Sequence, residues 1–278
     1  MRKNRLKQLL RDGRPAIGSW LMLSDPFAVE VMAQTGFDWL LIDTEHCSIG
    51  TESLRNILVA LKGSPTVPVV RLLSNNPDYF KIALDLGAEG IMVPMIQTAD
   101  DARRAVESCR YPPLGCRGFG PIRASRYFKE MDDYCREANE EILLVAQIES
   151  ALAVRNLDSI LAVPGVDAIF IGQADLAASI GSLAQWKHPQ VAQLVSEVTA
   201  MAGARRMPWG LVCDTVEEAL AQAGRGATLL TVGGDLFFLI KTAADYLSRT
   251  RAGLHTEQKD GSEAALPHSA SASLAEDR

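Results

Sequence analysis

The feature that most constrains the fold is a regular alternation of short apolar runs with longer segments of helical periodicity. Eight runs occur, and each is almost continuously apolar, which is typical of parallel strands buried on both faces. The predicted strands are 16–22, 38–43, 67–71, 89–94, 142–148, 166–171, 207–213 and 228–233. The predicted helices that follow them are 26–35, 52–62, 77–86, 98–110, 152–162, 189–206, 216–223 and 236–247. Eight such pairs favour an α/β fold with a single (β/α)8 TIM barrel over an open doubly wound sheet.

The two ends of the chain lie outside this alternation. Leu6, Leu9 and Leu10 have helical spacing before Gly13, which predicts a short amphipathic helix that plugs the bottom of the barrel. The last residues, 255–278, are rich in Ser, Ala, Glu and Asp and show no periodicity, which predicts a disordered tail. We therefore expect a barrel domain over residues 1–254 and a tail over 255–278.

The composition restricts the class of ligand. With 47% hydrophobic and 22% charged residues, the 278-residue chain has the composition of a soluble globular protein. The net charge is −6 and no cluster of lysine or arginine marks a helix, so neither nucleic acid nor an anionic membrane is an expected partner. No signal peptide or membrane span is apparent, which predicts a cytoplasmic location. The five cysteines are scattered without a C-x-x-C pair, so we expect reduced thiols and a small-molecule ligand.

Two acidic residues follow neighbouring predicted strands. Glu149 comes directly after the fifth strand, and Asp175 lies four residues after the sixth. Consecutive parallel strands end at the same edge of a sheet, so these carboxylates are expected side by side. A divalent cation with oxygen ligands would neutralise them. Under the alternative interpretation, each carboxylate caps a helix, one starting near Ser150 and the other covering 176–180.

A histidine and an arginine are also predicted at this edge. His46 follows the second strand in the motif D-T-E-H, where Asp43 could orient the imidazole for general acid/base chemistry. The alternative is a loop histidine with only a hydrogen bond. Arg71 ends the third strand and needs an anionic partner, because a guanidinium does not lose its proton. That partner is either a substrate oxygen or a structural carboxylate, with Glu149 and Glu45 as candidates.

A site with two carboxylate ligands leaves room for water and for a chelating substrate. Such a site suits Mg²⁺ or Mn²⁺ and an α-keto acid that binds through its carboxylate and carbonyl oxygens. The cation would then act as a Lewis acid on the carbonyl. No lysine lies at the end of a predicted strand, so a Schiff-base mechanism is not expected.

The segment from Tyr111 to Glu141 is too long for an ordinary connection between a helix and a strand. It carries Arg117, Arg123 and Arg126, which predict a lid or a subunit contact that faces an anionic substrate. A solvated loop with some positive charge is the alternative.

Several long motifs occur together and in order: DWLLIDTEH, VPVVR, GAEGIMVP, QIES-x-x-AV-x-NLD, PGVDAIFIG-x-ADL-x-x-S-x-G and TVGGD. By these motifs the chain resembles the class II, metal-dependent pyruvate aldolases of the HpcH/HpaI family, typified by 4-hydroxy-2-oxoheptanedioate aldolase. The resemblance covers about Gly18 to Leu247. It implies a lyase that reversibly cleaves a 4-hydroxy-2-oxo acid to pyruvate and an aldehyde through a metal-bound enolate. It also implies a homo-oligomer, a hexamer built from trimers that often exchange the last barrel helix.

The resemblance also implies roles for individual residues. Glu149 and Asp175 would bind the metal, with Co²⁺ as a further option beside Mg²⁺ and Mn²⁺. His46 with Asp43 would form the acid/base dyad, and Arg71 would stabilise the pyruvate enolate. The residues implied in substrate binding are Trp20, Gln147, Gly172 and Ala174.

Three positions beside the expected pocket depart from the family pattern. Gln173 stands where proline is common, Cys47 where a small residue is frequent, and Gly234 where serine is usual. These differences leave the acceptor aldehyde open. Two alternatives to the aldolase also stay open, namely a Claisen-type citrate synthase of a siderophore pathway on the same scaffold, and a catalytically silent barrel that binds a keto acid.

Overall fold

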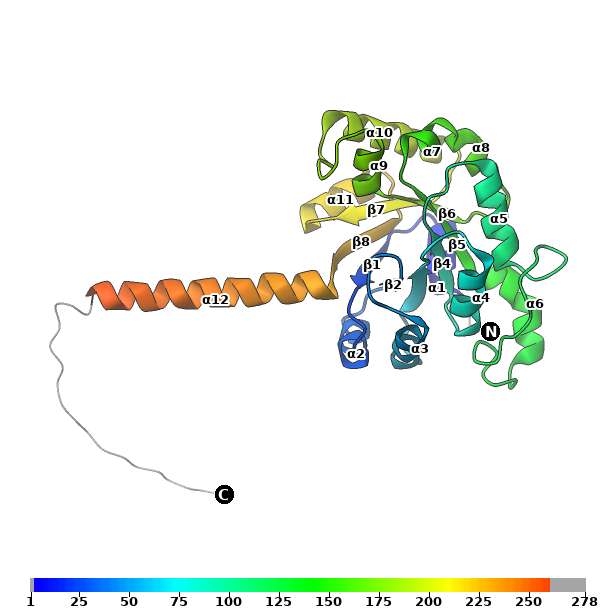
Figure 1. The fold of residues 1–278 in the computed structure, drawn as a ribbon, viewed down its shortest axis with the longest axis horizontal. Coiled ribbons are helices and arrows are strands. Elements are labelled where there is room, and N and C mark those ends of the chain that lie inside the picture. Colours follow the sequence, from blue (N-terminus) through cyan, green and yellow to red (C-terminus); the bar gives the residue numbers. More distant parts are fainter. Residues whose placement is uncertain (1–2, 261–278) are drawn as a thin grey trace, which may run out of the picture. The chain divides into compact units, whose positions relative to one another are not determined.

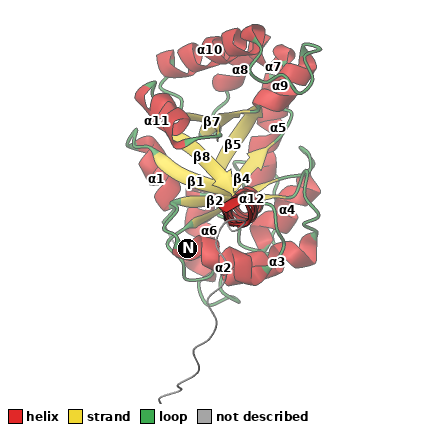
Figure 2. Cartoon of the chain, turned by 90° about the vertical axis from the view of Figure 1, so that its left-hand side faces the viewer, coloured by secondary structure: helices red, strands yellow, loops and turns green. Residues whose placement is uncertain are grey.

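The computed structural model describes residues 3–260, except for the side chains of 255–260. Within these residues, eight parallel strands close into a barrel in which each strand pairs with the next and β8 pairs with β1. The strands lie inside a ring of helices (Figures 1 and 2). They are β1 (Ala16–Leu21), β2 (Trp39–Asp43), β3 (Val67–Arg71), β4 (Gly90–Val93), β5 (Leu143–Ile148), β6 (Ala168–Ile171), β7 (Trp209–Cys213) and β8 (Leu229–Gly234). The predicted fold class is confirmed.

Most helices agree with the predicted segments to within about two residues. They are α1 (Arg5–Arg11), α2 (Pro26–Gln34), α3 (Thr51–Ala60), α4 (Pro77–Asp85), α5 (Ala99–Cys109), α10 (Pro189–Ala204) and α11 (Val216–Gly224). The predicted helix 152–162 is instead two short helices, α7 (Ala151–Arg155) and α8 (Leu157–Leu161). They meet at Asn156, whose side chain donates to the carbonyl of Gln97 at 2.9 Å. A further helix, α9 (Gln173–Ser179), follows β6.

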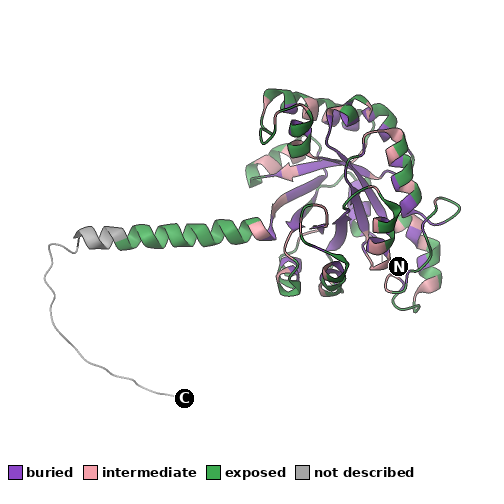
Figure 3. Ribbon diagram, in the orientation of Figure 1, coloured by how far each residue is buried: buried purple, intermediate pink, exposed green. Residues whose placement is uncertain are grey.

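The apolar core has two parts, which correspond to the two faces of the barrel wall. One lies between the strands and the helices, and the other fills the interior of the barrel. The strands are buried along almost their whole length (Figure 3). In the interior, Gly18 lies so close to Trp39 that an added Cβ would approach the indole to 2.4 Å. Leu6, Leu9 and Leu10 of α1 belong to the interior cluster, so the predicted plug is confirmed.

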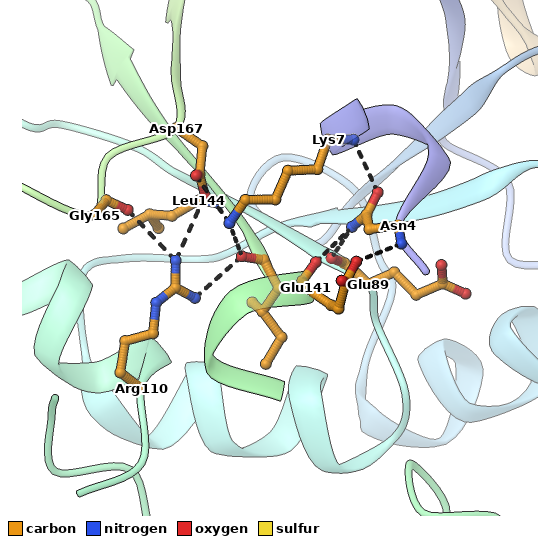
Figure 4. A network of polar contacts seen from close by, with 9 residues as sticks. Asn4, Lys7, Glu89, Arg110, Glu141, Leu144, Gly165 and Asp167 are labelled. Carbon is orange, nitrogen blue, oxygen red and sulfur yellow. Dashed lines mark hydrogen bonds and ion pairs between the residues drawn. The ribbon is translucent and has the colours of Figure 1, made fainter. Parts of the chain in front are cut away.

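A polar network holds α1 at the N-terminal end of the barrel (Figure 4). The ammonium of Lys7 lies 2.9 Å from Asp167 and donates to the carbonyl of Ile142 at 3.1 Å. Arg110 approaches the other oxygen of Asp167 at 3.5 Å. Burial lowers the pKa of Lys7, although Asp167 opposes the shift. This end is therefore closed by apolar packing and by ion pairs, which leaves the opposite end for chemistry.

The segment from Tyr111 to Glu141 is not the lid that its arginines predicted, and a subunit contact of this segment stays a prediction. It contains α6 (Met131–Glu141), and its arginines bind within the chain: Arg117 to Asp85, Arg123 to the carbonyls of Leu58 and Leu86, and Arg126 to Glu130. The carbonyls that Arg123 caps lie at or beside the C-terminal ends of α3 and α4, where each helix leads into a strand. Arg123 therefore lies at the closed end of the barrel, away from the mouth.

The chain divides into two compact units, Met1–Leu236 and Phe237–Arg278. The last helix, α12 (Asp235–Asp260), continues past its predicted end at Leu247 and into the predicted tail. The rest of that tail, 261–278, lies outside the described residues. Between 237 and 254 the residues of α12 are exposed, including the apolar residues Phe237, Phe238, Leu239 and Ile240 (Figure 3). Among the described helices, none combines the length and apolar character of a membrane span.

Candidate active site

The centre of the barrel mouth is an ion pair between neighbouring strands. Asp43 and Arg71 end β2 and β3 and lie opposite each other in the strand register. Arg71 donates from Nε and Nη2 to the two oxygens of Asp43, at 2.9 and 2.8 Å. Burial alone would raise the pKa of Asp43, but the hydrogen bonds and the charge of Arg71 hold it below its usual value. Asp43 is therefore an anion that fixes the guanidinium in one plane.

The imidazole of His46 has a different neighbour from the one predicted. Asp43 accepts hydrogen bonds from the backbone N–H groups of Glu45 and His46, at 3.0 and 3.3 Å, and so shapes the loop after β2. The carboxylate beside the ring is that of Glu45, whose Oε2 lies 3.6 Å from His46 Nε2. The His46 side chain is 60% exposed. Asp43 thus acts on the backbone of His46, because its carboxylate is engaged by Arg71.

Arg71 has two further contacts that keep it buried at the mouth. Its Nη1 lies 3.2 Å from Glu45 Oε2, so the ion pair with Glu45 that was one of the predicted alternatives is confirmed. The guanidinium also lies over the ring of Trp20, 4.6 Å from the ring centroid. Trp20 is buried and donates from Nε1 to Thr231 Oγ1 at 3.1 Å. Trp20 therefore forms the wall against which Arg71 rests.

Glu149 is almost completely buried at the end of β5. Its Oε1 accepts a hydrogen bond from the backbone N–H of Met95 at 2.6 Å, and Met95 has a left-handed backbone with φ of 54°. Burial raises the pKa of Glu149 to about 7, and the charges of Glu45 and Asp175 add to the shift. Glu149 does not cap α7. The N-cap of that helix is the next residue, Ser150, whose side chain accepts a hydrogen bond from the backbone N–H of Ala153. The capping alternative for Glu149 was wrong.

Gly172 connects β6 to α9 and lies against two of the predicted site residues. A Cβ at this position would lie 2.6 Å from Glu149 Oε2 and 3.0 Å from Gln147 Nε2, so a side chain here would displace them. Asp175 is in the first turn of α9 and is exposed, as is Ala174. The N-cap of α9 is Gly172, so the alternative in which Asp175 caps a helix from 176 was also wrong.

Several oxygen atoms gather at the mouth, and two of them have no hydrogen-bond partner. Within the described residues, no group of three or more His, Cys, Asp or Glu side chains could hold a metal ion. The Oε1 of Gln147 and the Oε2 of Glu45 are nevertheless buried without a hydrogen-bond partner. Buried carboxylate and amide oxygens with unused acceptor capacity are what a hard divalent cation binds. These oxygen donors are compatible with a hard cation, and the charge of Asp175 acts on Glu149, but Glu149 and Asp175 as its ligands stay a prediction.

Comparison with known proteins agrees with this architecture. Residues 16–242 match the model of the HpcH/HpaI aldolase/citrate lyase family. The chain belongs to this family. Because relatives in it are named as aldolases, the protein is a carbon–carbon lyase.

Individual relatives span most of the chain. The 5-keto-4-deoxy-D-glucarate aldolase of Salmonella paratyphi A is 40% identical over 233 residues, which cover 84% of this chain and 91% of that protein. A family member from Burkholderia cenocepacia J2315 superposes with a TM-score of 0.86 at 37% identity, covering 89% of this chain and 99% of that one. Citrate synthase SbnG superposes with a TM-score of 0.77 at 29% identity, covering 93% and 99%.

No role was predicted for Asp235. This buried residue begins α12, and its carboxylate accepts from the backbone N–H groups of Met22 and Leu23 at 2.9 and 3.0 Å. It thereby ties the loop after β1, next to Trp20, to the end of β8. The signal was present in the motif TVGGD, where an acid lies two residues after a predicted strand. Cys47 was predicted only as a departure from the family pattern. In the structure its thiol contacts Asp43 Oδ2 at 3.4 Å.

Proposed function

We propose that this lyase reversibly cleaves a 4-hydroxy-2-oxo acid to pyruvate and an aldehyde. The observation that carries the proposal is the buried Arg71, held between Asp43 and Glu45 at the same mouth as Glu149. A fixed guanidinium stabilises the negative charge that develops when a carbon–carbon bond beside a keto group breaks. The resemblance to 5-keto-4-deoxy-D-glucarate aldolase supports a keto-deoxy sugar acid as the first substrate to test.

We further propose that Glu149 and Asp175 hold a divalent cation, either Mg²⁺ or Mn²⁺, with Co²⁺ as another option. When bound, the cation supplies Lewis acidity toward the 2-oxo group of the substrate. Gln147 offers its unpartnered Oε1, and the absence of a side chain at Gly172 leaves space beside Glu149. These contacts support a small, oxygen-binding pocket for the keto acid.

In the cleavage direction, the side chain of His46 takes the proton from the C4 hydroxyl group. The C3–C4 bond breaks, the aldehyde leaves, and the electron pair of the bond stays on the pyruvate fragment, where Arg71 faces the developing charge. A proton from solvent then adds to C3 to complete pyruvate, and His46 releases its proton to solvent. Asp43 keeps the guanidinium oriented through its two hydrogen bonds. Trp20 covers Arg71 and excludes water from it. In the synthetic direction, His46 returns the proton to the new hydroxyl group.

The test is a panel of 4-hydroxy-2-oxo acids, with pyruvate release coupled to lactate dehydrogenase. We expect turnover with Mg²⁺ or Mn²⁺ and loss of turnover with a chelator. Arg71→Lys keeps the charge but loses the bidentate geometry, and we expect a loss of about 10²-fold in kcat/KM. The matched control is Arg55→Lys, at an exposed pair with Glu52 on α3. If no member of the panel releases pyruvate with Mg²⁺, Mn²⁺ or Co²⁺, the proposal fails and the silent keto-acid-binding barrel becomes the better interpretation.

The similarity to citrate synthase SbnG supports a second candidate function, a Claisen-type condensation that forms citrate. The same cation site and guanidinium would serve an enolate that attacks a keto acid. Incubation with oxaloacetate and acetyl-CoA distinguishes the two functions, because only the condensation releases free CoA. Release of CoA without pyruvate formation from the hydroxy acids would favour the second candidate.

We also propose a cytoplasmic homo-oligomer, with six chains as the expected assembly. The apolar residues that α12 exposes support association between chains. Light scattering after gel filtration tests this directly. A monomer at micromolar concentration would contradict it.

A further inference from the structure

We propose that Glu45 is the positioning residue for His46, holding the imidazole at the mouth and matching the charge that it gains during proton transfer. This inference rests on the proposed aldolase function and deepens it. The dyad predicted from the motif D-T-E-H paired His46 with Asp43. The geometry points instead to Glu45, which lies between them in the sequence.

The first argument is the position of one oxygen atom. Glu45 Oε2 lies 3.6 Å from His46 Nε2 and 3.2 Å from Arg71 Nη1. It is buried and has no hydrogen-bond partner. The Glu45 side chain is 15% exposed, whereas that of His46 is 60% exposed. A carboxylate fixed by Arg71 therefore presents an unused acceptor to a mostly exposed ring.

The second argument is that Asp43 has no acceptor capacity left for the ring. Its two oxygens receive five donors, namely two groups of Arg71, the backbone N–H groups of Glu45 and His46, and the thiol of Cys47. An ionised carboxylate offers about four lone-pair sites. Asp43 is therefore saturated, and an imidazole N–H could bind it only by displacing one of these donors.

The third argument concerns charge during the reaction. When His46 takes the proton of the C4 hydroxyl group, the ring becomes a cation, and its Nε2–H can donate to Glu45 Oε2. The attraction is stronger in that state than before, which is the condition for a contact that accelerates the step. Burial has the largest effect on Glu45 and raises its pKa. The charges of Arg71 and His46 favour the carboxylate form, whereas those of Asp43, Asp175 and Glu149 oppose it.

A double-mutant cycle tests whether Glu45 acts through His46. Glu45→Gln keeps the shape and removes the charge, and we expect kcat to fall about 10-fold with little change in the KM of the keto acid. In a His46→Gln background the same change should cause no further loss, because the ring that it serves is gone. Equal losses in both backgrounds would overturn the proposal, since Glu45 would then act through Arg71 or the cation instead. Glu45→Asp should restore part of kcat.

A second measurement does not depend on turnover. In protein with ¹³C-labelled histidine, without metal or substrate, the mobility of the His46 ring is measured by NMR relaxation, with the ring signals assigned from His46→Gln. We expect the ring to be more mobile in Glu45→Gln than in the wild type, because the carboxylate that faces it is gone. Glu52→Gln, on the exposed face of α3, is the matched control and should leave the ring mobility unchanged. Equal ring mobility in wild type and Glu45→Gln would overturn the inference even in an active aldolase. A more mobile ring in Glu45→Gln without pyruvate release from any substrate would support the contact and refute the proposed function.

Discussion

Both ends of the barrel contain buried charged and polar residues, but these groups are paired at the N-terminal end and partly unpaired at the mouth. At the N-terminal end, Lys7 and Arg110 neutralise Asp167, and the backbone carbonyl of Ile142 accepts from both cations (Figure 4). At the mouth, buried oxygens of Glu45 and of Gln147 lack hydrogen-bond partners, and burial raises the pKa of Glu149. One end uses its polar groups to hold the structure together. The other leaves acceptor capacity unused, which is what a ligand site requires.

The largest effect that we expect is at the mouth. His46→Ala removes a positioned base and should lower kcat by about 10²- to 10⁴-fold, while the unfolding free energy changes little because the side chain is mostly exposed. Steady-state kinetics and denaturant unfolding, measured on the same preparation, check both parts. His188→Ala, at the N-cap of α10, is the matched control and should keep wild-type kcat. Wild-type turnover in His46→Ala would remove the imidazole from the mechanism.

The closed end should show the reverse pattern. Asp167→Asn leaves Lys7 and Arg110 without their counter-charge, and we expect a loss of about 3 kcal/mol in unfolding free energy with nearly unchanged kcat. Lys81→Ala, which breaks an exposed pair with Asp78, should cost less than about 1 kcal/mol. Urea unfolding followed by circular dichroism measures both. A large loss of kcat in folded Asp167→Asn would show that the two ends are not independent.

The strands were predictable because burial on both faces leaves near-continuous apolar runs, and because glycines with left-handed backbone, such as Gly36 and Gly87, end the preceding helices. The helix Met131–Glu141 was not predicted. It buries only Tyr134 and Ala138, and most of its other residues are charged or polar, so no apolar run marked it in the sequence. The spacing of these two residues by four is the helical signal that was missed.

The sequence predicted which residues lie at the strand ends, but not which side chains contact each other there. Asp43, Arg71 and Glu149 were placed at the mouth because they directly end or follow apolar strands. The pairing of Arg71 with Asp43 depends on the register of β2 and β3, and the approach of Glu45 to His46 depends on the loop after β2. Neither register nor loop geometry leaves a periodic signal in the sequence.

A third, smaller effect is the pH dependence of the unfolding free energy that the raised pKa of Glu149 causes. The pKa of Glu149 is about 7 in the folded protein, against a usual value of 4.5. Between these values the folded protein binds more protons than the unfolded chain, so stability should fall as pH rises from about 4.5 to 7. The expected loss is about 2 to 3 kcal/mol in metal-free protein. Denaturant titrations across this range test it against Glu149→Gln, in which this contribution to the pH dependence should vanish.

Added Mg²⁺ or Mn²⁺ should oppose that loss, because a cation that binds the carboxylate form favours the folded state at the upper end of the range. The gain should disappear in Glu149→Gln. A metal-free protein whose stability is constant or rises from pH 4.5 to 7 would contradict the raised pKa of Glu149.

The smallest effect is expected at Met95, which supports Glu149 through its backbone. Its left-handed φ of 54° is unfavourable for a residue with a side chain, and glycine adopts it without strain. Glycine also gains entropy in the unfolded chain, so the two contributions oppose each other and Met95→Gly should change stability by less than about 1 kcal/mol. Because the N–H that donates to Glu149 is retained, kcat should also stay near that of the wild type. Met95→Pro lacks this donor, and its ring cannot adopt a positive φ, so the loop must also move; we expect this variant to weaken cation binding measured by calorimetry. If Met95→Gly and Met95→Pro bind the cation equally well, the backbone of Met95 does not position Glu149, and the buried carboxylate is held by its packing against Gly172 alone.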